Sequence, residues 1–134
     1  MNRDPIASKR TMLSRALRRR CPRCGAGAFD SYFHMKETCQ QCGLHFERED
    51  GYWSGALIIN TTVTFASFLL VFVGGTLITW PDVPWGVLMA TTIAINAAIP
   101  VLFYPQSKTT WSALEMSWHP LEPDEIAAAA ARAA

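Results

Sequence analysis

The chain has 134 residues, 50% of them hydrophobic and only 17% charged, and its formal net charge is +1. That average hides a sharp division. All but two of the 12 Lys and Arg residues precede Gly51, and Asp82 is the only charged residue between Asp50 and Lys108. The net charge therefore says little about partners. The long uncharged stretches exclude an ordinary soluble core, because the rest of the chain is too short and too polar to cover them.

Residues 1–17 form a basic N-terminal segment that has few acids and lacks the apolar region of a signal peptide. A mitochondrial transit peptide would have a similar Arg-rich composition. A membrane-topology signal explains the same arginines without cleavage, and we favour that interpretation.

Two CxxC pairs follow the arginines, separated by 14 residues, which is close to the spacing of four-cysteine zinc sites. Zinc prefers four thiolates in a tetrahedron, and a cytoplasmic location disfavours lasting disulfides. Gly25 and Gly43 each follow the second thiol of a pair, where they suit the tight turn that points amide N–H groups at sulfur. We predict a zinc ribbon of short β-hairpins over residues 18–50, with one structural Zn²⁺. Its predicted ligands are Cys21, Cys24, Cys39 and Cys42.

The ribbon would have a core too small to hold without metal. A dithiol redox centre and an iron or iron–sulfur site are the alternatives for the same cysteines. His34 and His45 could each replace a thiol, but with four cysteines present we interpret them as exposed ribbon residues. The expected core residues are Phe29, Tyr32, Phe33, Leu44 and Phe46.

Two uncharged stretches, residues 53–80 and 85–104, would form helices of about 42 Å and about 30 Å, against roughly 30 Å of hydrocarbon. The longer helix must tilt or begin among the lipid headgroups. Residues 81–84 include two prolines and are too few for anything but an antiparallel turn. We therefore predict a transmembrane hairpin over residues 51–105, with aromatic anchors at its four ends. These anchors are Trp53, Trp80, Trp85 and Tyr104.

A stripe of small and weakly polar side chains recurs along the first span at three- or four-residue steps, as on helix contact surfaces in lipid. Asn60 and Asn96 lie at similar depth in the two spans, so we expect them to face each other or a shared partner. An interhelical hydrogen bond is the simpler role, and an ion or ligand path is the alternative. The predicted contact residues are Asn60, Thr64, Ser67, Gly74 and Asn96.

The residues after the second span predict a short C-terminal amphipathic helix over 106–120, with Ser107 as its N-cap and Trp111 and Trp118 as further interfacial anchors. Its apolar face would lie on the cytoplasmic headgroups or, as the alternative, dock against the ribbon. Residues 121–134 have high helix propensity but are too few to form a stable helix alone. We expect them to be a flexible tail.

The run CPRCGAGAFDSYFHMKETCQQCGLHFEREDGYWSGA, followed by two spans and FYPQSKTTWSALEMSWHP, resembles the domain of unknown function 983 family of small bacterial membrane proteins. The resemblance implies a zinc ribbon and a two-helix hairpin, and it implies no particular activity. Many members carry a Gly-Asp-Gly stretch before the first span, where this chain has EDGYWSGA. Some members are encoded near respiratory oxidase assembly genes, which suggests a respiratory setting.

The sequence contains no recognisable catalytic constellation, such as a Ser-His-Asp set or a phosphate-binding glycine loop. The excess of Lys and Arg before the first span predicts that both termini lie in the cytoplasm. Together with the resemblance to a family of bacterial membrane proteins, this implies a multi-pass protein of the bacterial inner membrane. We expect a non-enzymatic accessory, assembly or interaction subunit of a larger membrane complex. Its partners would be the lipid bilayer and another membrane protein.

Two other function classes stay open. A metal-handling or thiol-redox membrane protein would use the two CxxC pairs and release its metal readily. An oligomeric small transporter or channel would need a water path past Asn60 and Asn96. The basic run over residues 15–23 also fits nucleic acid, but topology and attraction to anionic lipid account for the same charges. No small-molecule substrate is indicated.

Overall fold

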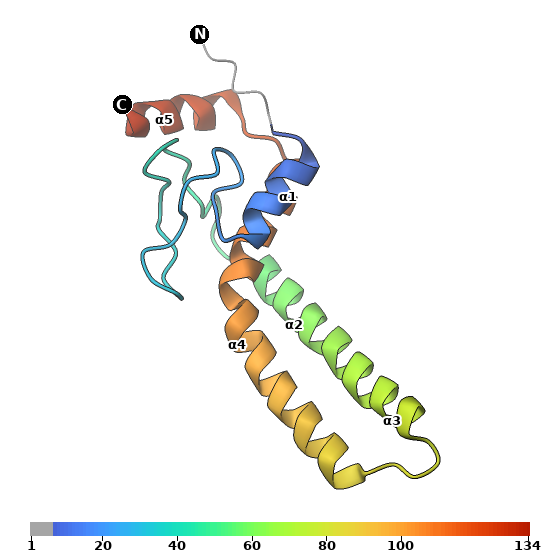
Figure 1. Ribbon diagram of the computed structural model, residues 1–134. Coiled ribbons are helices and arrows are strands. Elements are labelled where there is room, and N and C mark those ends of the chain that lie inside the picture. Colours follow the sequence, from blue (N-terminus) through green and yellow to red (C-terminus); the bar gives the residue numbers. More distant parts are fainter. Residues whose placement is uncertain (1–6) are drawn as a thin grey trace.

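The computed structural model describes residues 7–134, so the first six residues of the predicted basic segment lie outside the described part. Figure 1 shows one long helical hairpin, with the cysteine region (residues 18–50) and two short helices at its open end. The elements in chain order are α1 (Lys9–Leu17), α2 (Ser54–Phe68), the π-helical stretch η1 (Leu69–Val73), α3 (Gly74–Thr79), α4 (Trp85–Trp118) and α5 (Pro123–Ala133).

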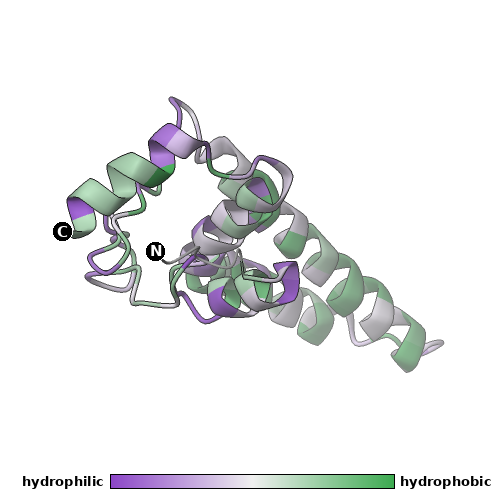
Figure 2. Cartoon of the chain, turned by 90° about the horizontal axis from the view of Figure 1, so that it is seen from above, coloured by the Kyte–Doolittle hydropathy of each residue, from purple (hydrophilic) through white to green (hydrophobic). Residues whose placement is uncertain are grey.

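The hairpin forms as the sequence predicted. α2, η1 and α3 follow one another along one arm, and α4 returns beside them (Figure 1). Ser54–Thr79 and Trp85–Trp118 are long and apolar enough to cross a membrane. In each of them, only 11% of an apolar stretch of 18 residues is buried. Hydrophobic residues cover the hairpin, whereas the hydrophilic ones concentrate at its open end (Figure 2). Core helices of a soluble protein would be covered, so this exposed apolar surface suits lipid.

The second arm is longer than expected. α4 continues through Pro100 and Pro105 to Trp118, so the separate amphipathic helix predicted over residues 106–120 is instead the last part of α4. Ser107 is not an N-cap but a fully buried residue within the helix, and its hydroxyl donates to the Tyr104 carbonyl at 2.6 Å. The helix therefore continues past Pro105 even though that residue cannot donate the N–H of a helical hydrogen bond.

The cysteine region contains short turns in place of the predicted β-hairpins. Between residues 7 and 134 the structure has no strand, and the hairpins shrink to three isolated antiparallel bridges. Each bridge pairs only one residue with another, and turns and bends interrupt the chain between the bridges, so none of them extends into a ladder. The bridges join Arg20 with Gly27, Phe29 with Met35, and Thr38 with His45.

The core of the cysteine region is shared with the helices. Leu44 and Phe46 are buried as predicted, but Tyr32 and Phe33 are 40% and 50% exposed, so the expectation that they fill the core is wrong. Residues of α1 and of the last part of α4 fill the core instead. The segment after the second span thus docks against the cysteine region, which was the alternative given for its apolar face. The cluster comprises Met12, Ala16, Cys21, Ala28, Met35, Cys39, Leu44, Phe46, Ala113 and Met116.

The predicted flexible tail contains a helix. α5 begins with a capping box, in which the Glu122 side chain accepts from the backbone of the first turn and Glu125 accepts from the Glu122 N–H at 2.8 Å. Ala129, in the middle of α5, is only 1% exposed because it packs against Gly43 in the cysteine region. An 11-residue helix is marginal alone. Docking supplies the stabilisation that the local sequence lacks.

Candidate metal centre

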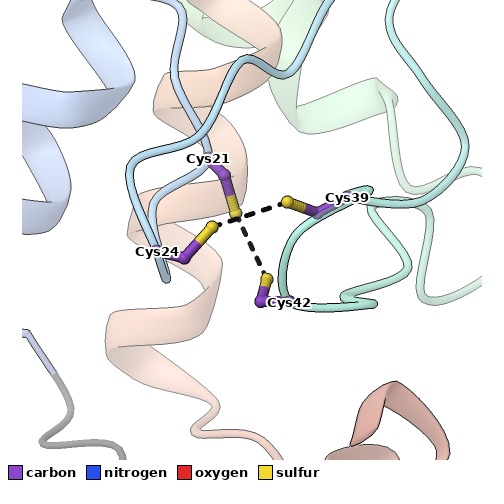
Figure 3. A group of neighbouring side chains, drawn as sticks. All are labelled: Cys21, Cys24, Cys39 and Cys42. Carbon is purple, nitrogen blue, oxygen red and sulfur yellow. Dashed lines mark hydrogen bonds between the residues drawn. The ribbon is translucent and has the colours of Figure 1, made fainter. Parts of the chain in front are cut away.

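The four cysteine sulfurs converge from two separate loops. Figure 3 shows Cys21 and Cys24 on the first loop pointing toward Cys39 and Cys42 on the second. All four Sγ atoms lie within 4.8 Å of one another, and none of the cysteines forms a disulfide. The Cys21 and Cys42 sulfurs are 3.8 Å apart, and those of Cys24 and Cys39 are 3.5 Å apart. The structure thus brings together all four ligand atoms that the spacing predicted.

Each CxxC pair folds into the same turn. In the first, the Cys21 N–H donates to the Ala26 carbonyl at 2.7 Å and the Gly25 N–H donates to the Cys21 carbonyl at 2.8 Å. In the second, the equivalent distances are 2.8 Å and 2.9 Å. Gly25 and Gly43 have φ angles of +83° and +68°, in the left-handed region that favours glycine. The repeated turn explains why both pairs present their sulfurs to one point.

The arrangement fits a tetrahedral metal ion. Zinc–sulfur bonds of about 2.3 Å in a tetrahedron separate the sulfurs by about 3.8 Å, close to the distances across this cluster. A hydrogen bond from the Cys21 thiol lowers the pKa of Cys42, whereas burial raises the pKa of Cys24 to about 11. Four thiolates at these separations would repel one another. A divalent ion would offset the repulsion among four of them.

Backbone amides also point at the sulfurs, as the sequence predicted. The amide N–H groups of Cys24, Ala26 and Leu44 hydrogen-bond the sulfurs of Cys21, Cys24 and Cys42, respectively, and each lowers the pKa of its thiol. Amide donors of this kind orient thiolate ligands around a metal and stabilise their charge.

An arginine from a neighbouring helix closes each turn. Arg15 of α1 donates to the Arg23 carbonyl at 2.8 Å, and Arg132 of α5 donates to the Gly43 carbonyl at 2.6 Å. The approach of α5 is so close that a Cβ on Gly43 would lie 1.9 Å from the Ala129 carbonyl oxygen. The two turns are therefore each held by a helix from outside the cysteine region.

Arg48 links the cysteine region to both C-terminal helices. Its guanidinium makes two 2.8 Å hydrogen bonds to the Glu125 carboxylate of α5. It also donates to the Glu115 carboxylate and, at 2.9 Å, to the His119 carbonyl at the end of α4. Its side chain is only 13% exposed, and the carboxylates raise its pKa further above the usual range. A bidentate pair of this kind fixes geometry as well as charge.

The two asparagines on opposite arms of the hairpin do not bond each other. Asn60 donates to the Pro100 carbonyl of α4 at 3.0 Å, so it does make an interhelical hydrogen bond. Asn96 donates to the Thr92 carbonyl of its own helix at 2.9 Å. Both asparagines line one groove between α2 and α4. Thr64 lines it as well, and Ser67 and Gly74 are partly buried along the same arm.

The predicted aromatic anchors divide into two groups. Trp80, Trp85 and Trp118 are 71%, 54% and 61% exposed, whereas Trp53 and Tyr104 are partly covered by the Lys108 side chain. Trp111 packs against α2, where a Cβ on Gly55 would lie 2.2 Å from its ring. Trp111 therefore joins the two arms, and its position at the lipid headgroups stays a prediction.

Sequence reasoning missed the residues that join the elements. From the sequence alone, three arginines look like ordinary surface charges: Arg15, Arg48 and Arg132. Thr109 looks like part of an interfacial helix. Thr109 is fully buried, and its hydroxyl donates to the Ala16 carbonyl of α1 at 2.6 Å. Two signals were available, because Arg48 lies within the FERE stretch and Thr109 within FYPQSKTTW, and both stretches carry the family resemblance.

Comparison with protein families matches residues 29–116 to the family described as "Protein of unknown function (DUF983)". The matched range includes the second CxxC pair and most of both arms of the hairpin, and it begins after Cys21 and Cys24. No curated protein and no solved structure matches the chain. Because the match covers more than half of the sequence, the chain belongs to this family of proteins of unknown function.

Proposed function

We propose that the protein is a non-enzymatic accessory subunit of a larger complex in the bacterial inner membrane, with both termini in the cytoplasm and one structural zinc ion. The observation that carries the proposal is the four-thiol cluster at the open end of two lipid-length helices. Cys21, Cys24, Cys39 and Cys42 would hold the ion, which would contribute folding energy. Four protein ligands leave no coordination position for water, so a structural role is favoured over catalysis.

The position of the charges supports the same orientation. The basic α1 and the cysteine region lie at the end of the hairpin where both arms meet the polar part of the molecule (Figures 1 and 2). Only residues 80–84, with a single charge at Asp82, connect the arms at the other end. By the positive-inside rule the basic end faces the cytoplasm. The exposed apolar sides of the hairpin are available to pack against lipid or a membrane partner.

Metal and thiol content tests the first half of the proposal. The chain, extracted in detergent under mildly reducing conditions, should contain one zinc per molecule and no thiol that reacts rapidly. Cys42→Ser should lose the zinc, because a three-thiol site binds structural zinc much less tightly. Metal-free protein with thiols that cycle reversibly with oxidant would overturn the structural role.

Capture at native expression tests the second half. The tagged chain, solubilised in a mild detergent, should elute with another integral membrane protein at a fixed ratio. Recovery as a free monomer, with its zinc retained, would contradict the accessory role but leave the metal site intact.

Metal handling is a second candidate, favoured by an asymmetry within the cluster. Cys21 and Cys39 are buried, whereas Cys24 and Cys42 are partly exposed, so one sulfur of each pair is accessible to an exchange partner. A handling site should yield its zinc to a moderate chelator while the chain stays folded. A structural site should retain the zinc until the cysteine region unfolds.

A further inference from the structure

The loop between the two cysteine pairs reaches down to the lipid-facing part of α4. At its tip, Tyr32 donates its hydroxyl hydrogen to the Leu102 carbonyl at 2.7 Å, and the Phe33 ring lies 6.4 Å from the Tyr104 ring. Tyr32 and Phe33 also pack edge to face, with their ring centroids 4.8 Å apart. The tip is therefore fixed against the arm of the hairpin, away from the core of the cysteine region.

Lys108 marks the level of the lipid headgroups on this arm. Its ammonium lies 4.8 Å from the Trp53 ring and 5.1 Å from the Tyr104 ring, where one apolar arm begins and the apolar stretch of the other ends. Leu102 precedes Tyr104 by two residues and Lys108 by six, so its backbone lies about 3 Å deeper toward the hydrocarbon than that of Tyr104 and about 9 Å deeper than that of Lys108. Since Tyr32 contacts Leu102, the tip lies at or just below the headgroup level.

The tip has the chemistry of an interfacial anchor. Tyr32 and Phe33 are 40% and 50% exposed, and they adjoin the lipid-facing residue Leu102, which is 58% exposed. The guanidinium of Arg19 lies over the Tyr32 ring at 4.6 Å, which places a cation beside the aromatic pair. Amphipathic aromatic rings with neighbouring cations favour the zone between lipid phosphates and acyl chains.

We infer that Tyr32 and Phe33 form a membrane anchor of the cysteine region, inserted among the headgroups and upper acyl chains of the cytoplasmic leaflet. The metal centre would then lie against the bilayer in a fixed orientation. The inference rests on the proposal that the two arms cross the membrane. The partner at this surface is phospholipid, with Arg19 placed to meet its phosphate.

The test places the photoreactive analogue p-benzoylphenylalanine at Phe33 in the full chain, reconstituted in nanodiscs of phosphatidylglycerol and phosphatidylcholine. Two further positions serve as references. Leu70 is 77% exposed in the middle of the first arm, and Gln41 is exposed on the second CxxC turn. Zinc content checks that each variant is folded. After illumination, mass spectrometry measures the fraction of protein carrying a covalent lipid adduct.

We expect several-fold more lipid adduct at position 33 than at position 41, approaching the yield at position 70. Equal yields at 33 and 41, with strong labelling at 70, would overturn the anchor but not the membrane topology. Absence of lipid adducts at 70 would overturn the topology and the anchor together. In native membranes, predominantly protein adducts at 33 would assign this surface to a protein and overturn the lipid assignment.

Discussion

Glu125 shows how one charged side chain fixes an element that is weak by itself. Its carboxylate receives two hydrogen bonds from Arg48, and these lower its pKa from the ordinary value of 4.5. A carboxyl group whose pKa is lowered by folding stabilises the folded state above its unfolded pKa, and that contribution is lost as the pH falls. The docking of α5 should therefore depend on pH below about 4.5.

We predict that Glu125→Gln weakens α5 docking by about 1 kcal/mol at pH 7, since the side chain is partly exposed, and that this difference from the unaltered chain disappears as the pH falls below about 4.5. Amide hydrogen exchange of α5 would measure this difference in docking. Because the variant and the unaltered chain are compared at the same pH, any loss of metal that affects both chains equally does not contribute to the difference. Asp124→Asn removes a charge from the same helical turn without removing the Arg48 pair, so an equal effect from that variant would contradict the specific role of Glu125.

Two adjacent threonines provide a matched pair for the contact between α1 and α4. The Thr109 hydroxyl donates to the Ala16 carbonyl, whereas the Thr110 hydroxyl is buried without a partner among the described residues. Thr109→Val should lower the free energy of unfolding by about 1 kcal/mol, and Thr110→Val should leave it unchanged or raise it. Thermal unfolding in detergent compares them. A similar loss from both variants would argue against a special role for the Thr109 hydrogen bond.

At the scale of elements, α5 and the second CxxC turn form one unit, because the helix backbone lies directly on Gly43. Gly25 occupies the same position in the first turn, but a Cβ there would meet only the flexible Arg15 side chain, with Nε at 3.3 Å. Both glycines have positive φ, so alanine at either position is strained by about 1–2 kcal/mol. Only at Gly43 would alanine also displace a helix.

We predict that Gly43→Ala releases α5, so that a protease cleaves the chain after residue 120 much faster than in Gly25→Ala. Limited proteolysis followed by mass spectrometry would detect this, with zinc content measured in parallel. Equal protection of α5 in the two variants would show that the helix tolerates a Cβ at position 43 and that the close approach is unimportant.

At the scale of the whole molecule, the metal centre joins elements that are far apart in sequence. α1, the cysteine region and the end of α4 share one core, and α5 covers the second turn. The hairpin, by contrast, is held by contacts between its own arms, such as the Asn60 hydrogen bond and the packing of Trp111 on Gly55. Metal removal should therefore affect the two parts unequally.

We predict that a strong chelator increases hydrogen exchange throughout residues 18–50 and in α5, while the amides of α2 and of α4 before Tyr104 remain protected. Exchange measured by mass spectrometry before and after chelation, with zinc restored as the reversal control, tests this. Uniform loss of protection over the whole chain would show that the hairpin also depends on the metal.

The sequence predicted the parts of the fold that depend on local composition. The apolar stretches, the turn between them and the spacing of the CxxC pairs are all local signals, and the structure contains each of them. The extension of α4 was missed because Pro105 reads as a helix end, whereas the helix beyond it packs against α1 and the cysteine region. α5 and the Arg48 network were missed because both depend on contacts across some 70 residues or more of chain.

The arms of the hairpin are joined at their far end by only residues 80–84. With the topology proposed above, nearly all of the water-exposed protein would lie on one side of the bilayer. The other side would offer a turn with one carboxylate, too little surface for a specific extracellular or periplasmic ligand. A ligand or partner protein would then bind this molecule only from the cytoplasm or within the membrane.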